Sequence, residues 1–387
     1  MRGADLVELS PPSKGRPATI GRALGVQVER LATRLARLTS HPRQPGRWPP
    51  APVPPFAVSG LTATFEELER ITLDPAIIAR VETPPKGALV RPGLPPPSLS
   101  RAVQALGWRR RARPARIYDI VPFGFELDLL ELRLAELHDV VDHFVVAEAS
   151  RGFGGMRKPL YLQRNWSRYA PFHPQVTPVV IDSEHLDGLY PMAHRDRTDW
   201  LGEDALRTRL WQHVRHLVLE PDAVVIWADV DELLPRWLLH LLRHYECPLP
   251  MRVQAPALRY HFGWRDPEAT AGVTIIDARS VPHIDLHAQA IRSLPARTFS
   301  ARGAVHLTSF LDPAVLLMKC ALTTDWEPGV LPYLRNEQDE IAAMMRDGTW
   351  FDRPLAPYDA ERDPLGLIPQ TARLNRDRYS AFWPGLH

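Results

Sequence analysis

Three acidic residues, Asp229, Asp231 and Glu232, directly follow the apolar run 223–228. The run contains β-branched and aromatic residues without polar alternation, which is typical of a strand buried on both faces of a parallel sheet. Open α/β sheets bind their ligands at the carboxyl ends of such strands. Two carboxylates separated by one residue can share a divalent cation that carries a diphosphate. The pattern favours a nucleotide-sugar transferase; the alternative is a solvated acidic turn before a helix that begins near Leu233.

Elements that alternate between strand and helix surround this motif. We predict strands at 117–123, 143–149, 176–181 and 223–229, and helices at 126–141 and 203–219. Further strands are predicted at 251–257 and 272–277, and a further helix at 313–322. The order strand, helix, strand, strand, helix, strand predicts an α/β fold of Rossmann type, with a mostly parallel sheet flanked by helices.

The chain divides into three parts by composition. Residues 1–115 contain repeated Pro-Pro pairs, which predict a partly disordered, Pro-rich extension with short helices. One helix is expected at 20–39, with arginines opposite its apolar stripe, and either packs on its own domain or contacts an anionic membrane surface. Another should follow the capping box at Thr64 and stop or restart at Pro75. The main domain is expected at 116–350, with residues 351–387 as a C-terminal tail packed on it.

Overall composition excludes several classes of protein. The 387 residues include 47 basic and 45 acidic side chains, so no net field attracts nucleic acid. Cys247 and Cys320 form neither a disulfide framework nor a metal-binding spacing. No apolar run approaches the roughly 18 residues of a membrane span, and the N-terminus lacks an apolar signal core. These features predict a soluble, cytoplasmic protein.

Several blocks of the sequence resemble glycosyltransferase family 17, which includes the β-1,4-mannosyl-glycoprotein β-1,4-N-acetylglucosaminyltransferases. The blocks are 121–137, 140–148, 158–161, Glu203 with Arg207, 229–232, 259–264, 303–310, and Lys319 with Glu327. The resemblance extends from about Arg116 to Asp347. The chain departs from the family pattern at Val305, where the family has Trp, and at Asp325, where it has His.

The resemblance implies a GT-A-like fold and a metal-dependent, inverting transfer from a UDP-sugar, with UDP-GlcNAc as the donor. We assign Asp231 as the direct metal ligand. Asp229 is placed on the ribose or on a metal-bound water. A late histidine often completes the metal site in this fold, and His306 matches that place; without the resemblance His306 would be interpreted as structural. Mn²⁺ accepts mixed oxygen and imidazole ligands, so we expect Mn²⁺, with Mg²⁺ as the alternative.

Further charged residues are assigned to the donor. Glu148 ends a predicted strand and could hold the uracil or ribose; a helix cap or a salt bridge is the alternative. Arg207 could pair with phosphate through its guanidinium fork, or with Glu203 one helical turn away. Lys319 is one of four lysines in an arginine-rich chain, which hints at a specific role. Glu126, at the start of a predicted helix, completes the donor set.

The general base and the acceptor are less specified by the sequence. Glu327 and Asp285 are the candidate bases, with Glu327 preferred because it matches the family block. Trp264 is assigned to an acceptor subsite, where it would stack on a sugar face. We expect a glycan, a glycolipid or a small glycoside as the acceptor.

Two other classes of function remain open at this point. A phosphatase of the haloacid dehalogenase type also places Asp-x-Asp after a strand, but usually with Thr two residues later, where this chain has Leu233. A catalytically silent scaffold, whose Pro-rich N-terminus recruits a partner, is the second alternative.

Overall fold

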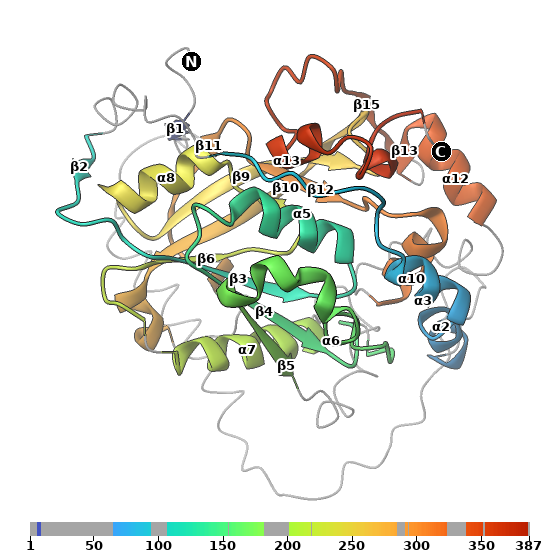
Figure 1. The fold of residues 1–387 in the computed structure, drawn as a ribbon, viewed down its shortest axis with the longest axis horizontal. Helices are drawn as coiled ribbons and strands as arrows, with labels where there is room; N and C mark the ends of the chain where they lie inside the picture. The colour runs from blue at the N-terminus through green and yellow to red at the C-terminus, as the bar shows by residue number, and fades with distance from the viewer. Residues whose placement is uncertain are drawn as a thin grey trace, which may run out of the picture. The chain divides into compact units, whose positions relative to one another are not determined.

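A mixed β-sheet places the acidic motif at the end of one of its inner strands (Figure 1). The computed structural model describes residues 6–8, 65–93, 107–153, 155–181, 201–217, 219–284, 291–292, 294–322, 338–350 and 353–385. They belong to one compact unit, which comprises Met1–Leu9 and Pro55–His387. The helix predicted at 20–39 lies outside the described residues, so its proposed membrane contact stays a prediction.

The predicted strands are confirmed, and four of them form a parallel half-sheet in the order β6-β3-β4-β5. These strands are β3 (Ile117–Phe123), β4 (His143–Ala149), β5 (Val176–Ile181) and β6 (Val224–Trp227). The sheet continues through β10 (Trp264–Asp277) and β9 (Met251–Arg259), which pair antiparallel, to β11 (Arg297–Ala301) and β12 (Val305–Thr308), both parallel to β9. The fold is therefore α/β, with an antiparallel hairpin inserted between two parallel sets of strands.

Helices cover both faces of the parallel half-sheet. They are α5 (Leu127–Leu137), α7 (Leu201–Arg215), α8 (Arg236–His244) and α10 (Pro313–Leu322). Alternate residues of β3 separate the two faces: Ile117 and Val121 pack in one core with α5 and α8, and Ile120 packs in a second core with α7. This period-two alternation is what a strand buried on both faces requires.

Two helices of the predicted N-terminal extension pack on the main domain. They are α2 (Phe65–Thr72) and α3 (Pro75–Glu82), and both contact α10. The predicted restart at Pro75 is confirmed: Asp74 caps α3 through an oxygen that accepts the Ala76 N–H at 2.7 Å. Proline is suited to the first helical position, where its missing N–H is not needed.

One sequence prediction about the acidic motif is wrong. No helix begins at Leu233; Glu232–Leu233 instead form the short strand β7, which pairs antiparallel with β12. Helix α8 begins at Arg236, after Pro235. The pairing with β12 fixes the acidic turn against the strand that carries His306.

The C-terminal residues pack over the antiparallel part of the sheet. Aromatic rings of the tail, including Phe382 and Trp383, surround Phe262, whose ring centroid lies 5.1 Å from that of Trp383. The elements described after residue 337 are α12 (Gln338–Asp347), β13 (Thr349–Trp350), β14 (Arg353–Pro354), β15 (Ala356–Pro357), α13 (Gln370–Leu374) and η5 (Ser380–Phe382). The remaining short elements are β1 (Leu6–Glu8), β2 (Arg109–Arg110), α6 (Tyr161–Arg164), η1 (Trp166–Gln175), β8 (Tyr245–Glu246) and η4 (Ala278–His283).

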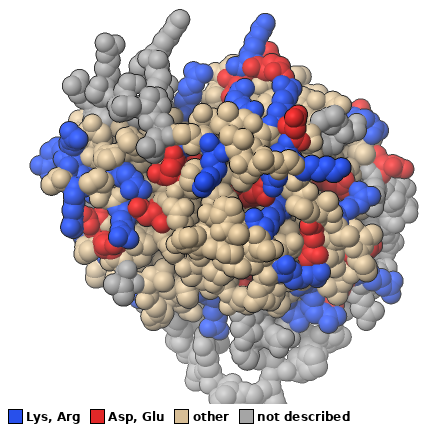
Figure 2. Space-filling view, in the orientation of Figure 1, with Lys and Arg blue, Asp and Glu red and all other residues tan. Residues whose placement is uncertain are grey.

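Acidic and basic side chains are interspersed on the face shown in Figure 2. Exposed arginines pair with nearby acids, as Arg109 does with Glu246 at 2.8 Å. Among the helices that the structure describes, none is both long enough and apolar enough to span a lipid bilayer.

Candidate active site

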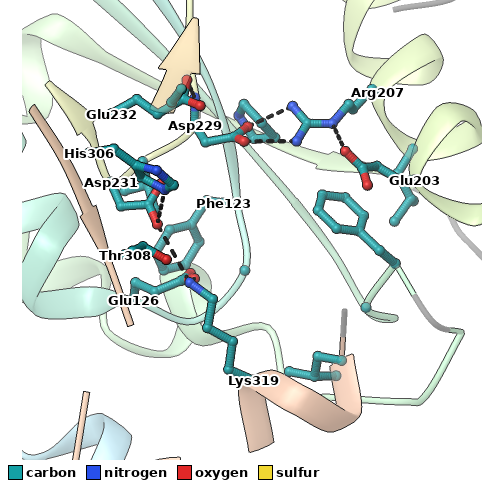
Figure 3. A pocket seen from close by; sticks show the side chains of 18 of the residues that line it. Phe123, Glu126, Glu203, Arg207, Asp229, Asp231, Glu232, His306, Thr308 and Lys319 are labelled. Atoms are coloured by element: carbon teal, nitrogen blue, oxygen red, sulfur yellow. Dashed lines mark hydrogen bonds and ion pairs between the residues drawn. The ribbon is translucent and has the colours of Figure 1, made fainter. Parts of the chain in front are cut away.

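A cavity of about 790 Å³ opens at the carboxyl ends of β3, β4 and β6. Strands β9, β10 and β12 and helix α10 form its other walls. The cavity brings together six residues that the sequence assigned to chemistry, Glu126, Arg207, Asp229, Asp231, His306 and Lys319. Figure 3 shows them converging from five separate segments of the chain.

Asp231 lies between the imidazole of His306 and the ammonium group of Lys319 in this cavity (Figure 3). Its Oδ2 is 3.4 Å from Nε2 of His306 and 3.5 Å from Nζ of Lys319. Burial alone would raise the pKa of Asp231, but the charges of His306 and Lys319 outweigh that effect and lower the pKa to about 2. The carboxylate is therefore ionised and available to a cation. Lys319 also lies 3.7 Å from Oε1 of Glu126, so one ammonium group bridges two carboxylates.

Asp229 is held by two arginines. Nη1 and Nη2 of Arg207 donate to its two oxygens at 2.6 and 3.0 Å, and Nη2 of Arg292 donates to Oδ2 at 3.0 Å. Nε of Arg207 also donates to Glu203 at 2.7 Å, so both partners considered from the sequence are present. Burial would raise the pKa of Asp229, but the two guanidinium groups hold it well below its ordinary value. Both oxygens of Asp229 thus accept hydrogen bonds from arginines, whereas Oδ2 of Asp231 faces His306 and Lys319.

A buried arginine that sequence reasoning missed holds the backbone of the acidic turn, residues 229–232. Nη1 of Arg133, on α5, donates to the carbonyls of Asp229 at 3.0 Å and Glu232 at 2.7 Å. Its other nitrogens pair with Asp119 of β3, both at 2.8 Å. Both side chains are fully buried. Glu131 of the same helix is also buried.

Arg292 is the second residue of the site that the sequence did not reveal. It pairs with Glu232 as well as with Asp229, and its backbone carbonyl accepts a hydrogen bond from Arg252. The sequence signal is weak because arginine is abundant in this chain.

Glu148 and Trp264 are not among the residues that line the cavity. The carboxylate of Glu148 accepts the N–H groups of Leu162 and Gln163 at the start of α6 and pairs with Lys158 at 3.5 Å. This is the cap and salt bridge that stood as the alternative to donor binding. The indole nitrogen of Trp264 donates to the carbonyl of Met345 at 2.9 Å. The two candidate bases, Glu327 and Asp285, lie outside the described residues.

The fit of a divalent metal depends on Asp231 and His306. Across the part of the chain that the structure describes, no three His, Cys, Asp or Glu side chains are close enough to enclose an ion. Two protein ligands suit an ion such as Mg²⁺ or Mn²⁺ that takes its remaining ligands from substrate phosphates and water. The oxygen and imidazole donors match Mn²⁺, so the residues fit a shared site rather than a closed one.

Gly152 allows the end of α10 to approach the cavity closely. A Cβ at this position would lie 2.6 Å from the carbonyl oxygen of Leu322, three residues after Lys319. We expect Gly152→Ala to displace this end of α10 and to destabilise the protein by about 1–3 kcal/mol through overpacking. Urea unfolding measures the change in the free energy of unfolding. Gly93→Ala is the matched control, because a Cβ there would meet nothing within 4 Å; equal effects of the two variants would contradict the expectation.

Comparison with known proteins connects this geometry to a family. Residues 94–277 match the model of glycosyltransferase family 17. A β-1,4-mannosyl-glycoprotein 4-β-N-acetylglucosaminyltransferase of Rattus norvegicus is 31% identical over 183 residues, which are 45% of this chain and 33% of that protein. The proteins of the same name from Homo sapiens and Mus musculus are each 30% identical over the same shares.

The chain spans about a third of the length of these curated relatives. The matched segment contains the strands β3 to β6, the arginine on α7 and the acidic motif, and it ends at residue 277. His306 and Lys319 lie beyond it, so their place in the site depends on the geometry. The resemblance that the sequence motifs indicated is confirmed: residues 94–277 of this chain match glycosyltransferase family 17.

Proposed function

We propose that the protein transfers a sugar from a UDP-sugar, with UDP-GlcNAc as the donor, to a hydroxyl group of a glycan, glycolipid or small glycoside. The observation that carries the proposal is the ionised Asp231, with Lys319, His306 and two arginines around it, in a cavity at the carboxyl end of β6. Ligands of open α/β sheets bind at this edge. The match to the family and the names of the relatives support the choice of donor sugar.

The cavity has the size that a nucleotide-sugar requires, with an apolar side and a cationic side. Its volume of about 790 Å³ lies within the range of roughly 300–1,000 Å³ of ligand pockets. Apolar residues at the ends of β3 to β5, such as Ala147 and Ile181, can pack on a base and ribose. Arg207, Arg292 and Lys319 form a cationic side that suits a diphosphate. This arrangement supports a GT-A-like assignment of the fold.

The residues of the chain can contribute to an inverting displacement in defined ways. Lys319 and the two arginines would orient the diphosphate and balance its charge as the sugar leaves. Asp231 and His306 would hold a divalent cation, Mn²⁺ or Mg²⁺, which when bound supplies Lewis-acid stabilisation of the departing diphosphate. Arg133 would keep the carbonyl groups of the acidic turn from moving during the reaction. Walls packed by buried side chains would exclude water from the reacting groups.

The geometry disfavours the phosphatase alternative. A phosphatase of that type uses the first aspartate of its motif as the nucleophile, which requires a free carboxylate oxygen. Here both oxygens of Asp229 accept hydrogen bonds from arginines.

The proposal predicts that UDP and Mn²⁺ together stabilise the protein. At a ligand concentration of about 100 times Kd, binding to the folded state adds about 2.7 kcal/mol. A thermal-shift scan with UDP and Mn²⁺, repeated with EDTA, measures the effect, and GDP is the matched control nucleotide.

Turnover is then followed by mass spectrometry of UDP-GlcNAc. Water serves as the default acceptor, and 4-nitrophenyl β-D-mannoside serves as the glycoside probe, because the relatives are named for a mannosyl acceptor. Neither stabilisation nor consumption of UDP-GlcNAc, with UDP-glucose and UDP-galactose also inert, would refute the proposed function.

A further inference from the structure

A second, smaller cavity adjoins the first. It has a volume of about 120 Å³ and lies between the start of α5, the start of α10, the end of α3 and η5. Phe125 and Glu126 line both cavities. Any group that enters the second cavity therefore approaches the first through these two residues, and Glu126 is the ionisable one of the pair.

The carboxylate of Glu126 is fixed at this junction. Glu126 precedes α5, but within the described residues its side chain makes no capping hydrogen bond to that helix. Instead, Oε2 accepts the N–H of Phe125 at 3.0 Å, and Oε1 faces Lys319 at 3.7 Å. A Cβ added to Gly124 would lie 3.0 Å from Oε2, so the side chain is folded back over that glycine. One oxygen is thus anchored and the other is directed at the ammonium group of Lys319.

We propose that Glu126 is the general base of the transfer and that the acceptor hydroxyl reaches it from the second cavity. This inference rests on the proposed function. In the step, the acceptor oxygen forms a bond to C1 of the donor sugar as the bond from C1 to the diphosphate oxygen breaks. The diphosphate leaves with the electron pair, and Glu126 takes the proton of the hydroxyl and later releases it to water. The products are a glycoside and UDP.

The bridge made by Lys319 connects this base to the donor. In the structure Lys319 lies 3.5 Å from Asp231 and 3.7 Å from Glu126. The anionic diphosphate competes for the ammonium group when the donor binds at Asp231. Oε1 of Glu126 would then face the acceptor hydroxyl in place of the ammonium group. Lys319 therefore lies between Asp231, at the leaving-group end of the site, and Glu126, at the acceptor end.

The second cavity suits the hydroxyl-bearing edge of a sugar. Its volume equals the share of about four water molecules at roughly 30 Å³ each, which is less than a whole pyranose ring. Leu129, Phe310 and Phe382 supply apolar walls for the C–H groups of a sugar edge. At the rim, Arg80 and Asp312 form an ion pair at 3.0 Å whose side chains are 53% and 42% exposed. The rest of the acceptor would extend across this polar rim.

Glu126→Gln tests the base directly. We expect kcat for transfer to 4-nitrophenyl β-D-mannoside, or to water, to fall by about 10²–10⁴-fold. The KM for UDP-GlcNAc and the affinity for UDP should remain within twofold, because the amide keeps the shape of the side chain. Glu327→Gln is the comparison, since the sequence favoured Glu327 as the base.

Three results would overturn the inference. A normal kcat in Glu126→Gln would show that Glu126 is not the general base. Weaker UDP binding with an unchanged kcat would show that Glu126 binds the donor instead. A larger loss of kcat in Glu327→Gln would identify Glu327 as the base. These outcomes differ from failure of the proposed function, in which the unmodified protein itself neither binds nor consumes UDP-GlcNAc.

A second variant tests the route of the acceptor. Ala381 is exposed in η5 and lines the second cavity. Ala381→Phe should fill the cavity and raise the KM for the mannoside at least fivefold, without changing UDP affinity or Tm. Ala170→Phe, at an exposed alanine of the 3₁₀ helix η1, is the matched control. An unchanged mannoside KM in Ala381→Phe would refute entry through this cavity.

Discussion

We expect replacement of Asp231 by Asn to reduce sugar transfer severely, while the protein stays folded. The substitution removes the carboxylate that Lys319 and His306 face and that would hold the metal. Loss of one group that stabilises developing charge in a site of this kind costs about 10²–10³-fold in kcat. Turnover of UDP-GlcNAc, followed by mass spectrometry, measures the loss. Circular dichroism and urea unfolding establish that the fold persists.

The matched control for this variant is Asp222→Asn. Asp222 precedes the same strand, β6, and pairs with Arg113 at the surface. It should retain full activity. The Mn²⁺-dependent part of the thermal shift with UDP should disappear in Asp231→Asn and persist in Asp222→Asn. An Asp231→Asn variant with normal turnover would show that the acidic motif does not carry the reaction.

The second large effect is expected on stability, from Arg133→Met. Arg133 and Asp119 form a fully buried, bidentate ion pair, and Arg133 also donates to carbonyls of the acidic turn. Burial would lower the pKa of Arg133, but Asp119 outweighs that effect and raises it, so the guanidinium stays charged. Removing one partner of such a pair leaves an uncompensated buried charge and costs about 3–5 kcal/mol. Urea unfolding measures the free energy of unfolding.

A double variant separates the charge effect from the positioning effect. Asp119→Leu combined with Arg133→Met removes both charges and should recover part of the lost stability. The carbonyls of Asp229 and Glu232 would still lack their donor, so transfer should remain impaired. If the free energy of unfolding of Arg133→Met lies within about 1 kcal/mol of that of the unmodified protein, water or another donor replaces the guanidinium. Recovery of full activity in the double variant would show that Arg133 contributes charge balance alone.

Local sequence was sufficient to locate most of the elements. The β-branched run before Asp229 and the alternation of Ile117 and Ile120 reflect how each strand is buried, and burial on both faces leaves a short-range pattern. The turn at Pro75 was equally readable, because proline and its capping aspartate act within a few residues. The boundary after Glu232 was misplaced, because pairing of β7 with the distant strand β12 overrides the preference of an acidic turn to start a helix.

A residue of the site could be predicted from the sequence when it belongs to a motif or when its residue type is rare in this chain. Asp231 belongs to a motif, and Lys319 stands out in a chain with few lysines. Arg292 carried no such signal, since any of the many arginines could have reached the motif. Glu148 was assigned to the donor because it ends a strand, but the N–H groups at the start of α6 and the ammonium of Lys158 take up its carboxylate.

The amino-acid sequence by itself determined the α/β order of elements, the family and the acidic motif at the end of β6. Tertiary structure alone decided that Arg133 supports the motif, that Asp229 is bound by arginines while Asp231 faces the cavity, and that Glu126 stands between two cavities. The physical reason is the range of the interactions. Backbone pattern depends on neighbours a few residues apart, whereas the pairing of a buried charge depends on which distant side chain the fold brings within about 3–4 Å.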